Sequence, residues 1–139
     1  MKIEIIQNKI YEIRGEKVML DFDIAHLYEV ETRVFNQAIK RNIQSFPKDF
    51  MFRLTAKEWK EMISQTVISS QRRRKLSSPP YAFSEHGVTM LASVLKSPKA
   101  RKMNIAIVRA FIALKKLAYS NLSAVNLLKE LRHRIDEHD

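Results

Sequence analysis

The sequence predicts an α+β domain: an N-terminal β-hairpin and small sheet with a helix-turn-helix, then a helical C-terminal part that ends in a long or broken helix. Three observations support this class. Residues 3–20 alternate partly between apolar and polar side chains around a Gly15-Glu16 turn, which is typical of a hairpin. Residues 23–44 carry apolar side chains at helical spacing, and from Ser97 onward helical periodicity persists almost to the end.

The first elements follow from local signals. We expect strands over residues 3–14 and 17–20, on the two sides of the glycine turn. Asp21 and Asp23 are both acceptable N-caps, and they predict a short helix over residues 24–28.

A second helix is expected over residues 32–44. It ends before Pro47, because the residue before a proline avoids the α region. Residues 50–54 are a plausible strand. Thr55 then caps a further helix, and Glu58 three residues later completes a capping box.

The second half of the chain has two clear helix starts. Ser84 is an N-cap for a helix over residues 85–96, and Ser97-Pro98 places a capping serine before a proline at the first helical position. The polar stretch 66–80 between these parts is expected to be an exposed loop or a two-stranded wing.

The charge of the chain is strongly segregated. The 139 residues carry a net charge of +10, but residues 1–31 are net −3 and residues 117–139 are net −1, so residues 32–116 carry +14. A basic band between near-neutral flanks matches a surface that binds a polyanion, because each neutralised phosphate releases counterions. The alternative is general solubility, which would not require such segregation.

Residues 23–42 match the requirements of a helix-turn-helix. Ala25 is the small residue needed where the two helices cross, and residues 29–31 form a turn of the right length. Glu29 occupies the turn position that commonly holds glycine, and a positive φ there costs roughly 1 kcal/mol. The second helix has an apolar stripe that we expect to be buried, made of Phe35, Ala38, Ile39, Ile43 and Phe46.

The opposite face of that helix carries cations and amides but no acid: Arg33, Asn36 at its margin, Gln37, Lys40, Arg41 and Gln44. Arginine pairs bidentately with guanine, and glutamine or asparagine with adenine, so this set suits readout of the major groove. We assign Arg33, Asn36 and Gln37 to base edges, and Lys40 and Arg41 mainly to phosphates. The alternative is a solvated charged face, although such faces normally mix signs.

Four consecutive cations follow in the serine-rich stretch, namely Arg72, Arg73, Arg74 and Lys75. We expect this run to grip phosphates or to enter the minor groove. The alternative is a flexible solvated loop, which would still add non-specific affinity for DNA.

The C-terminal residues contain a heptad seam that begins at Ile107 and Ala110 and continues through the residues expected to mediate dimerisation: Leu114, Leu117, Asn121, Ala124, Leu128, Leu131 and Ile135. An asparagine at an a position lowers stability but fixes the register, and it favours a paired, parallel homodimer. Two alternatives remain open. The first half of the seam can pack on the protein's own domain, and residues 119–121 can break the helix. The expected organisation is therefore a domain over residues 1–97 and a helical segment over residues 98–139 that packs on it and mediates dimerisation.

Catalysis and metal binding have no support in the sequence. The four histidines form no HExxH pattern, and no acid cluster accompanies them at metal-ligand spacing. We therefore expect a protein without enzymatic activity that binds no metal ion and no cofactor. The absence of cysteine fits a reducing cytoplasm. No run of about 18 apolar residues occurs, so we expect no membrane span and a cytoplasmic protein, associated with the bacterial nucleoid or located in a phage-infected host.

Two motifs carry a family resemblance. VMLDFDIAHLYEVETRVFNQAIKRNIQSFPKDFMFRLT (residues 18–55) and PYAFSEHGVTMLASVLKS (residues 80–97) resemble the signatures of the KilA-N and Bro-N superfamily of phage and prophage proteins. The closest resemblance is to the branch named for the N-terminal domain of "open reading frame six", and it covers about residues 3–115. Glu29 departs from the glycine that is usual in this family.

The resemblance implies an α+β domain that binds double-stranded DNA and takes part in gene regulation or antirepression. Because family members often carry a variable C-terminal region, the resemblance leads us to expect either a short member or a truncated one. The leading hypothesis is a sequence-specific DNA-binding regulator of transcription. The alternative is an antirepressor-type module that captures a repressor protein and binds DNA weakly or not at all.

Overall fold

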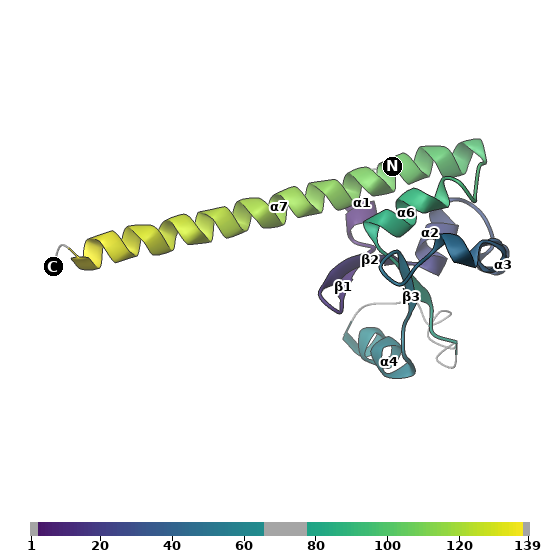
Figure 1. The fold of residues 1–139 in the computed structure, drawn as a ribbon, viewed down its shortest axis with the longest axis horizontal. Helices are drawn as coiled ribbons and strands as arrows, with labels where there is room; N and C mark the ends of the chain where they lie inside the picture. Colours follow the sequence, from purple (N-terminus) through teal and green to yellow (C-terminus); the bar gives the residue numbers. More distant parts are fainter. Residues whose placement is uncertain (1–2, 66–77, 138–139) are drawn as a thin grey trace.

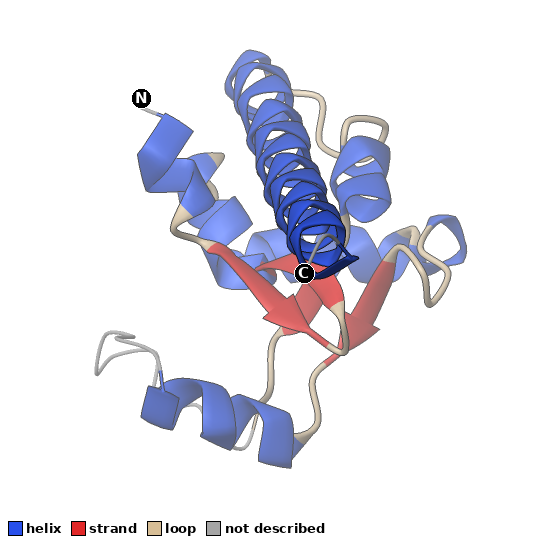
Figure 2. Cartoon of the chain, turned by 90° about the vertical axis from the view of Figure 1, so that its left-hand side faces the viewer, coloured by secondary structure: helices blue, strands red, loops and turns tan. Residues whose placement is uncertain are grey.

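The computed structural model describes residues 3–65 and 78–137 and confirms the α+β class. A four-stranded antiparallel sheet has the order β1-β2-β4-β3, built from Ile10–Ile13, Glu16–Leu20, Tyr81–Phe83 and Met51–Arg53. Helix α4 (Ala56–Gln65) lies on one side of this sheet (Figures 1 and 2). The other helices lie on the opposite side, where the long α7 (Pro98–Glu137) crosses the domain and then projects beyond it (Figure 1).

The N-terminus is helical where a strand was expected. Ile3–Gln7 form α1, and the first strand begins only at Ile10. The prediction of a strand over residues 3–14 was therefore wrong for its first half. Ile6 is 1% exposed and belongs to the main core, and α1 packs against α7. A helix as short as α1 is stable only through its contact with α7. The alternation of apolar and polar residues along residues 3–14 gives no information about that contact.

The hairpin itself is confirmed. Ile13 pairs with Glu16, which leaves Arg14 and Gly15 as a two-residue loop. Their φ angles of 57° and 76° are those of a type I′ turn, whose twist matches that of the flanking strands. The turn therefore lies one residue earlier than the Gly15-Glu16 pair predicted from the sequence.

Helix α2 (Asp21–Leu27) begins earlier than expected. Asp21 and Asp23 lie in its first turn and are buried, and no side chain caps the helix, so the prediction that they are N-caps was wrong. Asp21 instead accepts hydrogen bonds from the N–H of Phe22 (2.6 Å) and from that of Tyr81 on β4 (3.2 Å). It thus fastens the start of α2 to the sheet.

Helix α3 (Thr32–Arg41) follows after a four-residue connection. The N–H of Glu29 bonds to His26 O and that of Val30 to Ala25 O, which is the pattern of a Schellman motif. Glu29 has φ 60°, so the left-handed turn residue expected at this position is confirmed. Helix α3 ends three residues before the predicted boundary, and a 3-10 turn, η1 (Ile43–Ser45), follows it.

The sheet separates two hydrophobic clusters. Successive side chains of a strand point to opposite faces of the sheet. Val18, Met19 and Leu20 on β2 are all fully buried, because both faces are covered. Met19 joins the large cluster formed with α2, α3, α6 and α7, whereas Val18 and Leu20 join the smaller cluster around Trp59 of α4.

The predicted capping signals are confirmed at three helices. Thr55 Oγ1 accepts from the N–H of Glu58 (3.1 Å), and Glu58 Oε1 accepts from the N–H of Thr55 (2.8 Å). Ser84 caps α6 (Glu85–Leu91), and Ser97 Oγ accepts from Ala100 N–H (3.1 Å) at the start of α7. Helix α6 ends at Leu91 and not at residue 96.

Helix α7 is continuous through residues 119–121, so it is long and unbroken. The helix-breaking alternative considered for this stretch does not hold.

Candidate nucleic-acid interface

One side of α3 is anchored in the main core. Phe35 and Ile39 are fully buried, and the Phe35 ring meets Tyr28 and Phe83 edge-on at centroid distances of 6.4 and 5.7 Å. Such aromatic pairs stabilise a defined orientation beyond the burial of area alone. Helix α3 is therefore held in one orientation by contacts to α2 and to the sheet.

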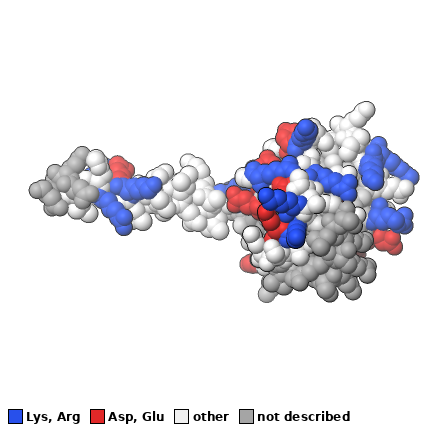
Figure 3. Space-filling view, turned by 90° about the horizontal axis from the view of Figure 1, so that it is seen from below, with Lys and Arg blue, Asp and Glu red and all other residues white. Residues whose placement is uncertain are grey.

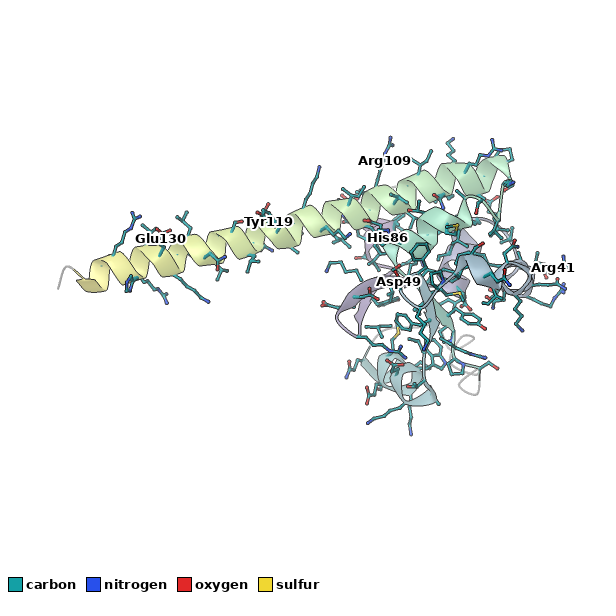
Figure 4. All side chains as sticks on the ribbon, in the orientation of Figure 1. Arg41, Asp49, His86, Arg109, Tyr119 and Glu130 are labelled. Carbon is teal, nitrogen blue, oxygen red and sulfur yellow. The ribbon has the colours of Figure 1, made fainter. Side chains whose placement is uncertain are left out.

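The opposite side of α3 faces solvent. Arg33, Gln37, Lys40 and Arg41 are all exposed, and the helix contains no acidic residue. Arg41 points outward at the edge of the domain farthest from the C-terminus of α7 (Figure 4). Lys and Arg side chains are present at this end of the molecule, and others lie across the same view of the domain, where acidic side chains accompany them (Figure 3). The structure thus presents a solvent-exposed helix face that is rich in hydrogen-bond donors.

Arg33 takes part in one surface ion pair. Its Nη2 lies 3.5 Å from Glu31 Oε2, and both side chains are 76% exposed. Pairs this exposed contribute little free energy, so the guanidinium can exchange the carboxylate for another acceptor at small cost.

Asn36 is placed differently from the other residues of the predicted face. It is half-buried, and its Oδ1 is buried without a hydrogen-bond partner in the described part of the chain. Burial raises the pKa of the nearby Asp21 carboxyl, while hydrogen bonds from Tyr81 N–H, the Asn36 side chain and Phe22 N–H oppose that rise. The Asn36 amide therefore faces Asp21 and joins α3 to the start of α2.

The apolar stripe predicted to be buried along residues 35–46 is interrupted at the end of α3. Ile43 was expected to be buried but is 48% exposed, because the helical period changes where η1 begins. Ala38 is half-buried, and Phe46 is buried as predicted. Gln44 is exposed, but it lies on η1 and not on α3.

Sequence reasoning missed two apolar groups and one cation beside this face. Val34 on α3 and Ile43 on η1 are 41% and 48% exposed. Lys99, in the first turn of α7, lies 3.4 Å from Glu29 in the turn between α2 and α3. Lys99 falls within the basic band of residues 32–116, but only the fold places it beside the turn before α3.

The run Arg72, Arg73, Arg74 and Lys75 lies outside the described residues. The chain re-enters the described structure at Ser78. There Arg53 Nε donates to Pro79 O (3.1 Å), and its guanidinium lies 5.5 Å from the Tyr81 ring centroid. The start of β4 is thereby held against β3.

Neither a metal-binding cluster nor a membrane-spanning helix occurs among the described residues. No group of three or more His, Asp or Glu side chains there is arranged to hold a metal ion. No helix within residues 3–65 and 78–137 is long and apolar enough to cross a membrane.

Comparison with protein families gives a match over most of the N-terminal domain. The family model described as the ORF6N domain matches residues 8–94, a span that includes the whole sheet, α2, α3 and α6. No curated protein and no solved structure matches the chain.

Proposed function

The chain belongs to the ORF6N domain family, and we propose that it binds double-stranded DNA sequence-specifically as a regulator of transcription in a phage or prophage setting. The family membership agrees with the resemblance noted in residues 18–55 and 80–97. One observation carries the proposal: α3 is anchored by Phe35 and Ile39 on one side and on the other presents exposed cations and the Gln37 amide, with no acid on the helix.

The chemistry of the exposed face suits the major groove. Arg33 lies in the first turn of α3, where a recognition helix meets base edges, and Gln37 lies one turn farther along the same face; they match guanine and adenine respectively. Lys40 and Arg41 lie in the last turn, where they can reach phosphates. Val34 and Ile43 add apolar groups that can contact thymine methyls.

Phosphate contacts outside α3 would position the domain. Lys99 is near the turn before α3, and its ammonium group could neutralise one phosphate of the DNA backbone. The run from Arg72 to Lys75 would add further contacts to the DNA backbone. Each such contact steepens the dependence of log K on log salt by about 0.9.

The experiment has two steps. Selection of bound sites from random duplexes identifies a target, and fluorescence anisotropy at several salt concentrations then compares the wild type with the double variant Arg33→Ala/Lys40→Ala. We expect that variant to bind at least about tenfold more weakly, with a salt slope reduced by about 1 to 2.

The matched control is Lys116→Ala/Lys129→Ala, which removes the same charge from exposed positions on the projecting part of α7. It should bind almost as the wild type does. Equal losses in the two double variants would reduce the effect to net charge and contradict the role of α3. Absence of duplex binding at low salt, together with tight binding to a repressor protein, would support the antirepressor alternative instead.

A further inference from the structure

One apolar stripe of α7 changes its surroundings halfway along the helix. In the first half, Met103, Ile107, Ala110 and Phe111 are buried against the domain. In the second half, every side chain described from Lys115 to Ile135 is exposed. Figure 1 shows that this half projects away from the domain, and Tyr119 in Figure 4 lies on a part of the helix with no other element beside it.

The exposed half continues the same heptad seam. Ile107, Leu114, Asn121, Leu128 and Ile135 occupy a positions, and Ala110, Leu117, Ala124 and Leu131 occupy d positions. Leu117 is 58% exposed, Leu128 61% and Ile135 64%. A row of leucines this exposed, at a spacing of three and four, is the pattern that a second helix covers in a coiled coil.

We propose that a second copy of this chain covers the seam, with its α7 running antiparallel. The first argument is the order of side-chain sizes along the seam, which reads the same in both directions: two leucines, two small residues, two leucines. In an antiparallel coil, a positions of one helix face d positions of the other. The resulting layers pair Leu114 with Leu131, Leu117 with Leu128 and Asn121 with Ala124, each across the two copies.

This pairing places large side chains against large ones toward both ends and small ones at the centre. The two Asn121 residues fall in adjacent central layers, about 4.5 Å apart along the axis, where their amides can hydrogen-bond to each other. The e and g positions, which flank the seam, bring no like charges together across the two copies. Ala118 of one copy faces Val125 of the other, and Ser120 faces Leu127.

The second argument is steric. The seam rotates by only about 20° per heptad on a straight helix, so the free half of the seam lies broadly on the side of α7 that the domain covers farther back. A parallel partner lying on Leu117 and continuing toward Ile107 would meet the volume that the domain occupies. An antiparallel partner meets the domain only with its last turn, because Leu131 of one copy is level with Leu114 of the other and only residues 134–137 are level with the covered residues 108–111.

The register sets the shape of the assembly. It places the two Ile107 residues about 46 Å apart along the helix axis, with one domain at each end. The proposal goes beyond DNA binding and does not depend on it.

Cysteine cross-linking tests the orientation, because the chain has no native cysteine. Leu117→Cys and Leu128→Cys are made as separate full-length variants. In the antiparallel register, positions 117 of the two copies lie about 16 Å apart along the axis, too far for a disulfide, and so do positions 128. We therefore expect no disulfide-linked dimer when either variant is oxidised alone. A linked dimer should form when the two variants are refolded together and then mildly oxidised.

Formation of a linked dimer by either variant alone would overturn the proposal in favour of a parallel coil. A monomeric mass of the wild type in sedimentation equilibrium at high micromolar concentration would overturn it altogether. The seam variant Leu117→Glu/Leu128→Glu should lose at least tenfold in dimer affinity. Tyr119→Glu, at a 73% exposed position outside the seam, should keep it.

The fluorescence of Trp59, the only tryptophan, reports the folding of the domain separately from the dimer. Trp59 is 1% exposed in the cluster beside α4, so its emission should be unchanged in all the α7 variants. A seam variant that becomes monomeric with unchanged Trp59 emission has lost the coil and not the fold. Loss of duplex binding with the dimer intact would contradict the proposed function but not this assembly.

Discussion

Arg14, at the tip of the β1–β2 hairpin, donates two hydrogen bonds to Glu58 in the first turn of α4. Nε meets Oε2 and Nη2 meets Oε1, each at 2.8 Å. The guanidinium also lies 4.3 Å from the centroid of the Phe52 ring. Bidentate pairing of this kind restrains both partners. It connects two elements that are 44 residues apart in the sequence, on the side of the sheet where the smaller core lies.

The first prediction concerns this pair and pH. The pKa of Glu58 is lowered from 4.5 to about 2, first by the hydrogen bond from Arg14 and further by the hydrogen bonds with Thr55. Because the folded-state pKa lies below the unfolded one, the stabilisation is present above about pH 4.5 and is lost as the pH falls toward 2. We expect Glu58→Ala to lower the free energy of unfolding by about 1–2 kcal/mol at pH 7 and by much less near pH 2.

Urea denaturation followed by Trp59 fluorescence measures this difference. Glu61→Ala, an exposed carboxylate on the same helix, is the control and should change stability little at either pH. A loss for Glu58→Ala that stays constant from pH 7 to pH 2 would contradict the role of the ionised pair.

The second prediction concerns the left-handed turn residue Glu29. Its φ of 60° strains any side chain with a Cβ, and glycine relieves that strain while adding some unfolded-state entropy. We expect Glu29→Gly to stabilise the domain by up to about 1 kcal/mol. The check is the thermal midpoint. Glu29→Ala keeps the Cβ and removes only the exposed pair with Lys99, so it should give no gain.

The third prediction compares the two glycines. A Cβ at Gly87 would overlap the carbonyl oxygen of Phe50, which is backbone and cannot turn aside. A Cβ at Gly15 would meet open space, but φ is 76° there. We expect Gly87→Ala to destabilise by about 3 kcal/mol or more and Gly15→Ala by about 1 kcal/mol. Urea midpoints that came out equal for the two variants would show that α6 can move away from the loop before β3.

The fourth prediction concerns a buried amide in α7. Asn104 Nδ2 donates to the Tyr28 hydroxyl (2.9 Å) and to Val88 O (2.6 Å), and it connects α7 to α2 and α6. Burial raises the pKa of Tyr28 to about 12, so its hydroxyl is neutral in the core at pH 7. Asn104→Ala leaves both acceptors without this donor and should cost about 2–3 kcal/mol in the free energy of unfolding. Asn126→Ala, on the exposed part of the same helix, is the matched control and should be close to neutral.

Local signals predicted much of the fold because short-range chemistry decides those features. The capping box at Thr55 and Glu58, the serine caps at Ser84 and Ser97, and the left-handed turn residue at Glu29 each depend on hydrogen bonds or φ angles within a few residues. The strand-like reading of residues 3–9 failed because the burial of Ile6 depends on contact with α7, about a hundred residues away.

The predicted DNA-binding face shows the same division. Helical spacing placed Arg33, Gln37, Lys40 and Arg41 together, and the structure shows all four exposed on α3. The spacing could not show that Asn36 faces Asp21, because that depends on where α2 begins relative to the sheet. Nor could it place Lys99 beside Glu29, since α7 reaches that turn only after α6 has reversed the chain.

The amino-acid sequence alone determined the helix and strand types with local signatures, the sign and position of the charge, and the heptad spacing of the C-terminal residues, because each of these is a property of neighbours along the chain. The tertiary structure decided which half of that heptad seam the domain buries and which half it leaves exposed. The physical reason is that the domain is shorter than α7: the stripe is covered as far as Phe111, and the leucines from Leu117 onward extend beyond the core that could have buried them.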